Sequence, residues 1–283
     1  SRDGNMGQNT RNFGHPGAGG SLGFADPDKH IGYGYVMNQM GNGIAGDPRA
    51  NALTEALTGL ADRPDVRVVV ITGTGSAFST GADITELSSA APASPEESTA
   101  NATETMRTGN ALIRAVIELP VPVIAQVNGI AAGVGASLAL ASDLVYAAEE
   151  AVFLLAFTNV GLMPDGGSSL LVPAAIGRAR ANAMTLLAEP MSATDAARSG
   201  LINEVLPAAD LEERVQKIAR KLARGPRRAL ELTKRAMTAS TLALLEDALC
   251  REAAGQIELL TSPNFREGIA AVLERRRPEF ARE

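Results

Sequence analysis

Apolar residues along the chain form short unbroken runs that alternate with stretches of helical spacing. Val66–Thr72 is a run of mostly β-branched residues that ends at Gly73, and Val121–Val127 is a second run that ends at Asn128-Gly129. Such runs predict strands that are buried on both faces of a sheet. Residues 103–118 between them carry apolar positions at helical spacing. This alternation predicts an α/β fold with a largely parallel sheet.

The same pattern continues towards the C-terminus. Two more strands are predicted, at residues 143–147 and 151–157. Helices are predicted at residues 48–61, 192–199, 211–222 and 230–259. Residues 129–141 are rich in glycine and alanine, which favours a buried core helix over a membrane span. Residues 90–98 are a low-complexity insertion that we expect to form a loop.

Composition narrows the classes of function. The 283 residues favour one large domain, and 26 Lys+Arg against 32 Asp+Glu give a net charge of −6, which argues against nucleic acid as the main partner. A basic run at residues 220–235 is typical of a solvated helix face. No apolar stretch has the length of a membrane helix and the N-terminus lacks a signal-peptide pattern, so we expect no membrane partner and a cytoplasmic location.

Cysteine and histidine counts limit the chemistry further. One cysteine excludes an intrachain disulfide and a cysteine-built zinc site. The two histidines, His15 and His30, both lie near the N-terminus. Acid–base chemistry in the main body must therefore use carboxylates, lysine, tyrosine or backbone dipoles.

Two glycine-bearing loops, residues 77–84 and 128–137, follow the two strongest predicted strands. Ligand sites of α/β proteins lie at the carboxyl ends of parallel strands, and glycine lets a backbone N–H face a ligand. One N–H from each loop could bind a single carbonyl oxygen and form an oxyanion hole. Ordinary strand-to-helix turns are the alternative.

Asp165 lies in a glycine-rich turn, Gly161–Leu170, ahead of an apolar helical stretch. One interpretation is a turn residue or a helix N-cap. The other is a carboxylate that projects into an apolar pocket. Burial in such a pocket would raise its pKa towards values that suit proton transfer.

Several motifs occur in an order that is typical of one family. From about Asn51 to Phe280 the chain resembles the crotonase, or enoyl-CoA hydratase/isomerase, superfamily. The matching pieces include residues 51–53, 66–73, 77–83, 122–129, 142–145, 193–205 and 267–280. The resemblance implies a crotonase fold of repeated ββα units with a C-terminal helical trimerisation region. We expect an atypical segment at residues 1–48, a core at 49–210 and the helical region at 211–283.

The resemblance also implies a ligand and an assembly. It implies an acyl-CoA thioester as substrate, with coenzyme A present only as part of that substrate, no permanently bound cofactor, no metal, and a homotrimer or hexamer. By position, the oxyanion donors fall on the backbone N–H groups of Ala82 and Val134. The substrate-binding positions are Ala82, Asp83, Ile84, Gly133, Val134, Gly135 and Phe157.

Departures from the family pattern bear on the reaction. Hydratases of this family carry two glutamates, and the matching positions here are Ser137 and Phe157, which cannot activate water. Asp165 stands where isomerases of the family carry their single acid, so the resemblance implies an enoyl-CoA isomerase of the epoxyphenylacetyl-CoA isomerase type with Asp165 as catalytic base. The alternatives are a hydratase and a catalytically impaired acyl-CoA-binding protein.

The N-terminal segment departs most. Residues 13–57, with His15-Pro16-Gly17, resemble the C-terminal strand pair of serine esterases related to class C β-lactamases. No serine in the chain has a lysine three residues later, so the nucleophile motif of those esterases is missing and no hydrolase activity is expected. We expect the chain to lack the strand hairpin and the longer first helix with which crotonases begin. Residues 31–37 could supply one replacement strand.

Overall fold

Two sheets form the centre of the molecule. The computed structural model describes residues 13–16, 22–26, 31–36, 48–81 and 94–281. The larger sheet has the order β1 (Phe13–Pro16), β2 (Leu22–Asp26), β3 (Ile31–Val36), β4 (Val68–Gly73), β6 (Val123–Val127), β8 (Leu144–Ala148) and β11 (Glu204–Leu206). The smaller has the order β10 (Met191–Ser192), β9 (Val152–Leu154), β7 (Ile130–Ala132) and β5 (Ala77–Ser79).

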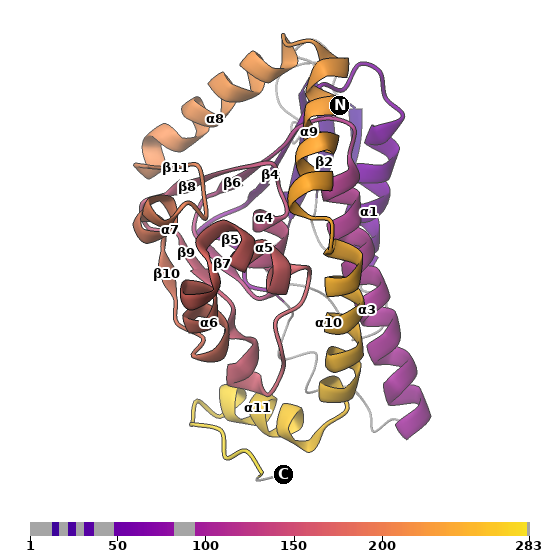
Figure 1. The fold of residues 1–283 in the computed structure, drawn as a ribbon, viewed down its shortest axis with the longest axis vertical. Coiled ribbons are helices and arrows are strands. Elements are labelled where there is room, and N and C mark those ends of the chain that lie inside the picture. Colours follow the sequence, from indigo (N-terminus) through magenta and orange to yellow (C-terminus); the bar gives the residue numbers. More distant parts are fainter. Residues whose placement is uncertain (1–12, 17–21, 27–30, 37–47, 82–93, 282–283) are drawn as a thin grey trace.

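Helices surround the two sheets, and α8 lies on the opposite side of the molecule from the long helices α3 and α10 (Figure 1). The helices are α1 (Pro48–Ala61), α3 (Pro95–Glu118), α4 (Val134–Leu140), the 3₁₀ helix η1 (Ala156–Val160), α5 (Ser168–Ile176), α6 (Arg178–Leu186), α7 (Ala193–Ser199), α8 (Ala208–Ala223), α9 (Arg227–Thr241), α10 (Leu245–Leu260) and α11 (Pro263–Leu273). Over the described residues, none of these helices is long and apolar enough to cross a membrane.

The repeated ββα unit explains how the two sheets arise. In each unit the first strand (β4, β6 or β8) joins the larger sheet and the second (β5, β7 or β9) joins the smaller one. Within each sheet these successive strands pair in parallel. The predicted α/β fold of ββα units is confirmed. The parallel pairing of β5 with β7 also places the carboxyl ends of these two strands side by side.

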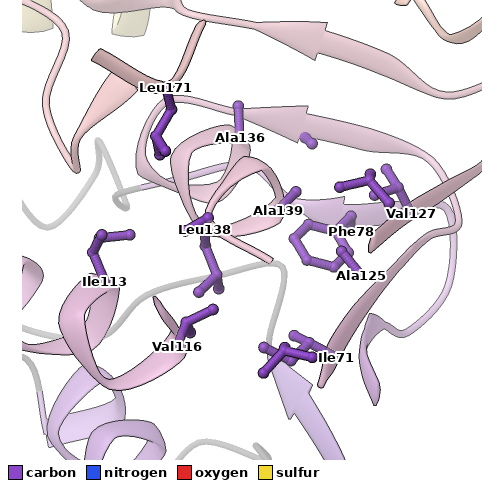
Figure 2. Close-up of a cluster of buried hydrophobic side chains, with 14 of the residues drawn as sticks. Ile71, Phe78, Ile113, Val116, Ala125, Val127, Ala136, Leu138, Ala139 and Leu171 are labelled. Atoms are coloured by element: carbon purple, nitrogen blue, oxygen red, sulfur yellow. The ribbon is translucent and has the colours of Figure 1, made fainter. Parts of the chain in front are cut away.

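Side chains that alternate along β4 face two separate clusters of buried apolar residues. Val68 and Val70 face one way and pack with buried residues of α8, including Leu211 and Val215. Ile71 faces the opposite way, into the space between the sheets, as residues of opposite parity do in a strand. Figure 2 shows Ile71 and Ala125 of the larger sheet on the same side as Phe78, with α3 and α4 side chains closing the cluster. Because both faces are covered, the unbroken apolar runs are buried strands.

Four local predictions need correction. Residues 129–141, expected to form a core helix, are the strand β7 followed by the helix α4. Residues 95–98 belong to α3, because Ser94 and Glu97 form a capping box in which each side chain bonds the other residue's backbone N–H. The run at 151–157 is the strand β9 followed by η1. The helical stretch at 230–259 is two helices, α9 and α10, that are separated at residues 242–244.

The N-terminal segment also differs from expectation. The expected lack of a strand hairpin is wrong, because β1 pairs antiparallel with β2, and β2 with β3. The strand expected at 31–37 is present as β3, and it pairs in parallel with β4, so the hairpins extend the larger sheet. The helix expected at 48–61 is present as α1. Residues 17–21, 27–30 and 37–47 of the esterase-like segment lie outside the described residues.

One residue of the basic run is buried. Lys234 of α9 forms a 2.8 Å ion pair with Asp143, and its side chain is 7% exposed. The ammonium also donates to the carbonyl oxygens of Val116 and Val121. Lys234 therefore fixes α9 to the end of α3 and to the start of β8, whereas Arg228 and Arg235 make exposed pairs with Glu231.

Candidate active site

Asp165 lies in a tight turn between η1 and α5, and the turn depends on two glycines. Gly166 and Gly167 have φ angles of +65° and +78°. This left-handed backbone is costly for residues with a Cβ. A Cβ on Gly166 would also lie 2.7 Å from the Cβ of Ser137. Glycine at position 166 thus lets the turn approach α4 closely.

The carbonyl oxygen of Asp165 is held by two hydroxyl groups. Ser137 Oγ and Ser168 Oγ each donate to it at 2.8 Å. Ser137 lies in α4 and Ser168 begins α5, and both are fully buried. The two bonds fix the backbone of Asp165 between the helices, one turn along α4 from the predicted oxyanion residue Val134.

The carboxyl group of Asp165 is buried. Its Oδ2 accepts a 2.7 Å hydrogen bond from Gln256 Nε2. Its Oδ1 is also buried, and none of the described residues donates a hydrogen bond to it. Burial raises the pKa of Asp165 to about 7, which the Gln256 hydrogen bond partly opposes and the nearby Glu252 charge reinforces. A carboxyl with this pKa can both accept and return a proton near neutral pH.

Two residues of α10 complete the surroundings of Asp165, and sequence reasoning missed both. Gln256 Oε1 accepts from the N–H of Met163, and Glu252 accepts from the N–H groups of Gly167 and Ser169. Glu252 and Gln256 are 0% and 1% exposed. Both lie one or two turns after the buried Leu249. Two polar residues on an apolar helix face were the available signal.

The loop after β7 is the second part of the site. Gly133 has φ of +54°, and its N–H donates to Leu154 O at 2.9 Å. Val134 is the first residue of α4, where an N–H has no acceptor within its own helix. The helix dipole adds partial positive charge at this end. The N–H of Val134 therefore has no partner within α4, and its role as an oxyanion donor stays a prediction.

Gly135 and Phe157 flank this donor in different ways. A Cβ on Gly135 would lie 2.5 Å from the Ser79 side chain, so glycine lets α4 start directly against β5. The ring of Phe157 lies 3.9 Å from the Cβ position of Gly133. Phe157 is 8% exposed, and it gives the loop that carries Gly133 and Val134 an apolar neighbour.

The loop after β5 holds the other expected donor. Ala82, Asp83 and Ile84 lie outside the described residues. Gly81, which precedes them, has φ of +81°, and its Cβ position lies 3.1 Å from Ala132 O. Gly81 therefore lies directly beside the loop that carries Gly133 and Val134. Within the described segments, no group of three His, Cys, Asp or Glu side chains could hold a metal ion.

Comparison with known proteins covers most of the chain. A family model described as enoyl-CoA hydratase/isomerase matches residues 46–283. A probable enoyl-CoA hydratase of Rhodobacter capsulatus is 43% identical over 218 residues, which are 77% of this chain and 82% of that protein. The 1,2-epoxyphenylacetyl-CoA isomerase of Escherichia coli is 37% identical over 228 residues, which are 81% of this chain and 86% of that protein.

Solved structures agree with these relatives. The crystal structure of an enoyl-CoA hydratase from Mycobacterium avium subsp. paratuberculosis superposes with a TM-score of 0.79 and is 41% identical, covering 90% of this chain and 96% of that one. The family model starts at residue 46, so the esterase likeness of the segment before it has no support from the family match.

Proposed function

The chain belongs to the enoyl-CoA hydratase/isomerase family, and we propose that it is an enoyl-CoA isomerase in which Asp165 carries the proton. Enzymes of this family act on CoA thioesters and need no permanently bound cofactor. The observation that carries the proposal is the Asp165 carboxyl, which is buried, has a pKa of about 7 and keeps Oδ1 without a donor among the described residues.

The proposed reaction moves a double bond by one carbon along the acyl chain. Asp165 removes a proton from C2 of a 3-enoyl-CoA. The C2–H electron pair forms a C1=C2 double bond, and the carbonyl π electrons move to the thioester oxygen, which gives a dienolate that keeps the C3=C4 bond. The N–H groups of Ala82 and Val134 hold that oxygen. Asp165 then returns the proton to C4, which gives the 2-enoyl-CoA. Each oxyanion donor contributes about 10²–10³-fold in rate.

A hydratase is the second candidate, because curated relatives such as the Rhodobacter capsulatus protein carry that name. Hydration needs a group that activates water and a group that delivers a proton to carbon. At the two positions where family hydratases carry glutamates, this chain has Ser137, whose hydroxyl is bonded to Asp165 O, and the Phe157 ring. The Ser137 hydroxyl is too weak a base to activate water and the Phe157 ring has no titratable group, and this favours isomerisation.

The test is a panel of 2-enoyl-, 3-enoyl- and arylacetyl-CoA esters, followed by absorbance and mass spectrometry. Isomerisation leaves the mass unchanged, whereas hydration adds one water. We expect Asp165→Asn to lose about 10²–10⁴-fold in isomerase rate, the usual contribution of a general base. The matched control is Asp62→Asn, the same substitution at an exposed carboxylate.

Three outcomes separate the candidates. Isomerisation by Asp165→Asn at the wild-type rate would exclude the role of Asp165. Hydration of crotonyl-CoA by the wild-type protein at a rate that exceeds isomerisation would favour the hydratase. Tight acyl-CoA binding in calorimetry without turnover of any ester would indicate an acyl-CoA-binding protein.

A further inference from the structure

Helix α10 presents two polar side chains to the interior, although its neighbouring inward positions are apolar. Glu252 and Gln256 are almost completely buried, and they follow Leu245, Ala248 and Leu249 on the same face. Burying a carboxylate or an amide costs free energy unless hydrogen bonds compensate. Among the described residues, the hydrogen-bond partners of these two side chains lie within residues 163–169, so both act on the segment that contains Asp165.

Gln256 contacts the segment at two points. Its Oε1 accepts from the N–H of Met163 at 3.2 Å, and its Nε2 donates to Asp165 Oδ2 at 2.7 Å. The first bond sets the orientation of the amide, because only the oxygen end can accept from an N–H. The NH₂ end must then face Asp165. Oδ2 is thereby occupied, and Oδ1 is the carboxyl oxygen without a donor among the described residues.

Glu252 holds the backbone that follows Asp165. Its two oxygens accept from Gly167 N at 2.7 Å and from Ser169 N at 2.9 Å. These N–H groups belong to the start of α5, whose N-cap residue is a glycine without a side-chain cap. Glu252 supplies the cap from another helix, where a negative charge is favourable. It also brings a negative charge close to Asp165.

We propose that Gln256 and Glu252 are positioning residues for Asp165, with Gln256 reserving Oδ1 as the oxygen that takes up and returns the proton and Glu252 fixing the backbone that carries the carboxyl. This inference rests on the proposed function. It adds that the orientation of the Asp165 carboxyl is set by α10, a helix that lies about ninety positions later in the sequence.

The two residues act on the charge of Asp165 in opposite directions. The Gln256 hydrogen bond favours the carboxylate and lowers the pKa of Asp165, whereas the Glu252 charge disfavours it and raises that pKa. The other elements that contact the turn, α4 and α3, present the uncharged Ser137 and Ile113 at Gly166. Burial raises the pKa of Glu252, which its hydrogen bonds to Gly167 and Ser169 and the charge of Arg251 partly oppose. Removal of each partner should therefore shift Asp165 in a different direction.

The experiment measures kcat and kcat/KM for the 3-enoyl-CoA ester against pH. The rate should rise through the pKa of Asp165, since the base must be ionised. In Gln256→Met this rise moves to higher pH, and kcat falls on the order of tenfold because the carboxyl is no longer held. In Glu252→Gln the rise moves to lower pH. Glu258→Gln, the same change at an exposed position of α10, leaves it unchanged.

A second substitution at position 256 keeps the test informative if Gln256→Met fails to fold. Gln256→Glu keeps the acceptor for Met163 and places a second carboxyl beside Asp165, so the rise moves to higher pH by like-charge repulsion. Thermal unfolding of each variant identifies any that fails to fold. A merely structural role for α10 lowers activity and stability without shifts of opposite sign.

The outcomes are distinguishable from failure of the proposed function. If Asp165→Asn keeps the activity or the pH-dependent rise, the proposed function is wrong. If Asp165→Asn is inactive but neither Gln256 variant shifts the rise, the role of Gln256 is wrong. If only Glu252→Gln fails to shift it while folding normally, the role of Glu252 is wrong.

Discussion

Ser137 Oγ donates a 2.8 Å hydrogen bond to the carbonyl oxygen of Asp165, and this bond joins α4 to the turn that carries the acid. Position 137 is therefore a structural neighbour of the acid. The hydroxyl is fully buried and serves the backbone. The chain thus uses for support a position that family hydratases use for chemistry.

Introducing a glutamate at this position is not expected to create a hydratase. Ser137 is in close contact with Gly166, and the longer side chain must displace the turn. We expect Ser137→Glu to lower the free energy of unfolding by about 1–3 kcal/mol, as overpacking does. Crotonyl-CoA should gain no water in mass spectrometry, because the partner position 157 is still a phenyl ring. Efficient hydration by this variant would contradict the assigned role of Ser137.

Gly166→Ala tests the turn itself. The alanine must adopt φ near +65° and place its Cβ 2.7 Å from the Cβ of Ser137. We expect a loss of about 2 kcal/mol or more in the free energy of unfolding, together with a fall in isomerase rate. Chemical denaturation measures the first effect. Gly109→Ala in the middle of α3, where a Cβ meets nothing within 4 Å, should instead stabilise by about 1 kcal/mol.

Stability should depend on pH through Asp165. Burial raises the pKa of Asp165 from 3.8 to about 7, so the folded state binds this proton more tightly than the unfolded state. The resulting stability is fully present below pH 3.8 and is lost as the pH rises through about 7. At 1.36 kcal/mol per pH unit, the loss amounts to at most about 4 kcal/mol.

Asp165→Asn removes this dependence. The free energy of unfolding of the variant minus that of the wild type should therefore increase from pH 4 to pH 8, by ~4 kcal/mol at most. Urea titrations at several pH values measure this difference. For Asp62→Asn, at an exposed position, the difference should not change with pH. A flat difference for Asp165→Asn would mean that the carboxyl is hydrated in the folded protein.

Local pattern was sufficient for the parts of the fold that are coded locally. The runs at 66–72 and 121–127 predicted the buried strands correctly. The segments 77–84 and 128–137 were expected to be loops, but they contain the short strands β5 and β7. The capping box at Ser94 and Glu97 was also visible as a serine followed three residues later by a glutamate. It was missed because the composition of residues 90–98 resembles that of a loop.

Contacts across the fold could not be predicted in this way. Gln256 and Asp165 are 91 positions apart, and their hydrogen bond depends on how α10 packs against α3 and α5. Likewise, Lys234 belongs to a run that is typical of an exposed face, yet it is buried against Asp143. Both contacts depend on which face of a helix packs against the rest of the fold, and this cannot be predicted from a single sequence.

The enclosure of the Asp165 carboxyl has a consequence for the fate of individual hydrogen atoms. An oxygen that is shielded from bulk water exchanges its hydrogen slowly, so the atom taken from C2 should be delivered to C4 of the same molecule. A substrate that carries deuterium at C2 should then yield a product that keeps the label in ordinary water. The fraction of deuterium that the product keeps would thus measure how well the Asp165 carboxyl is shielded from water.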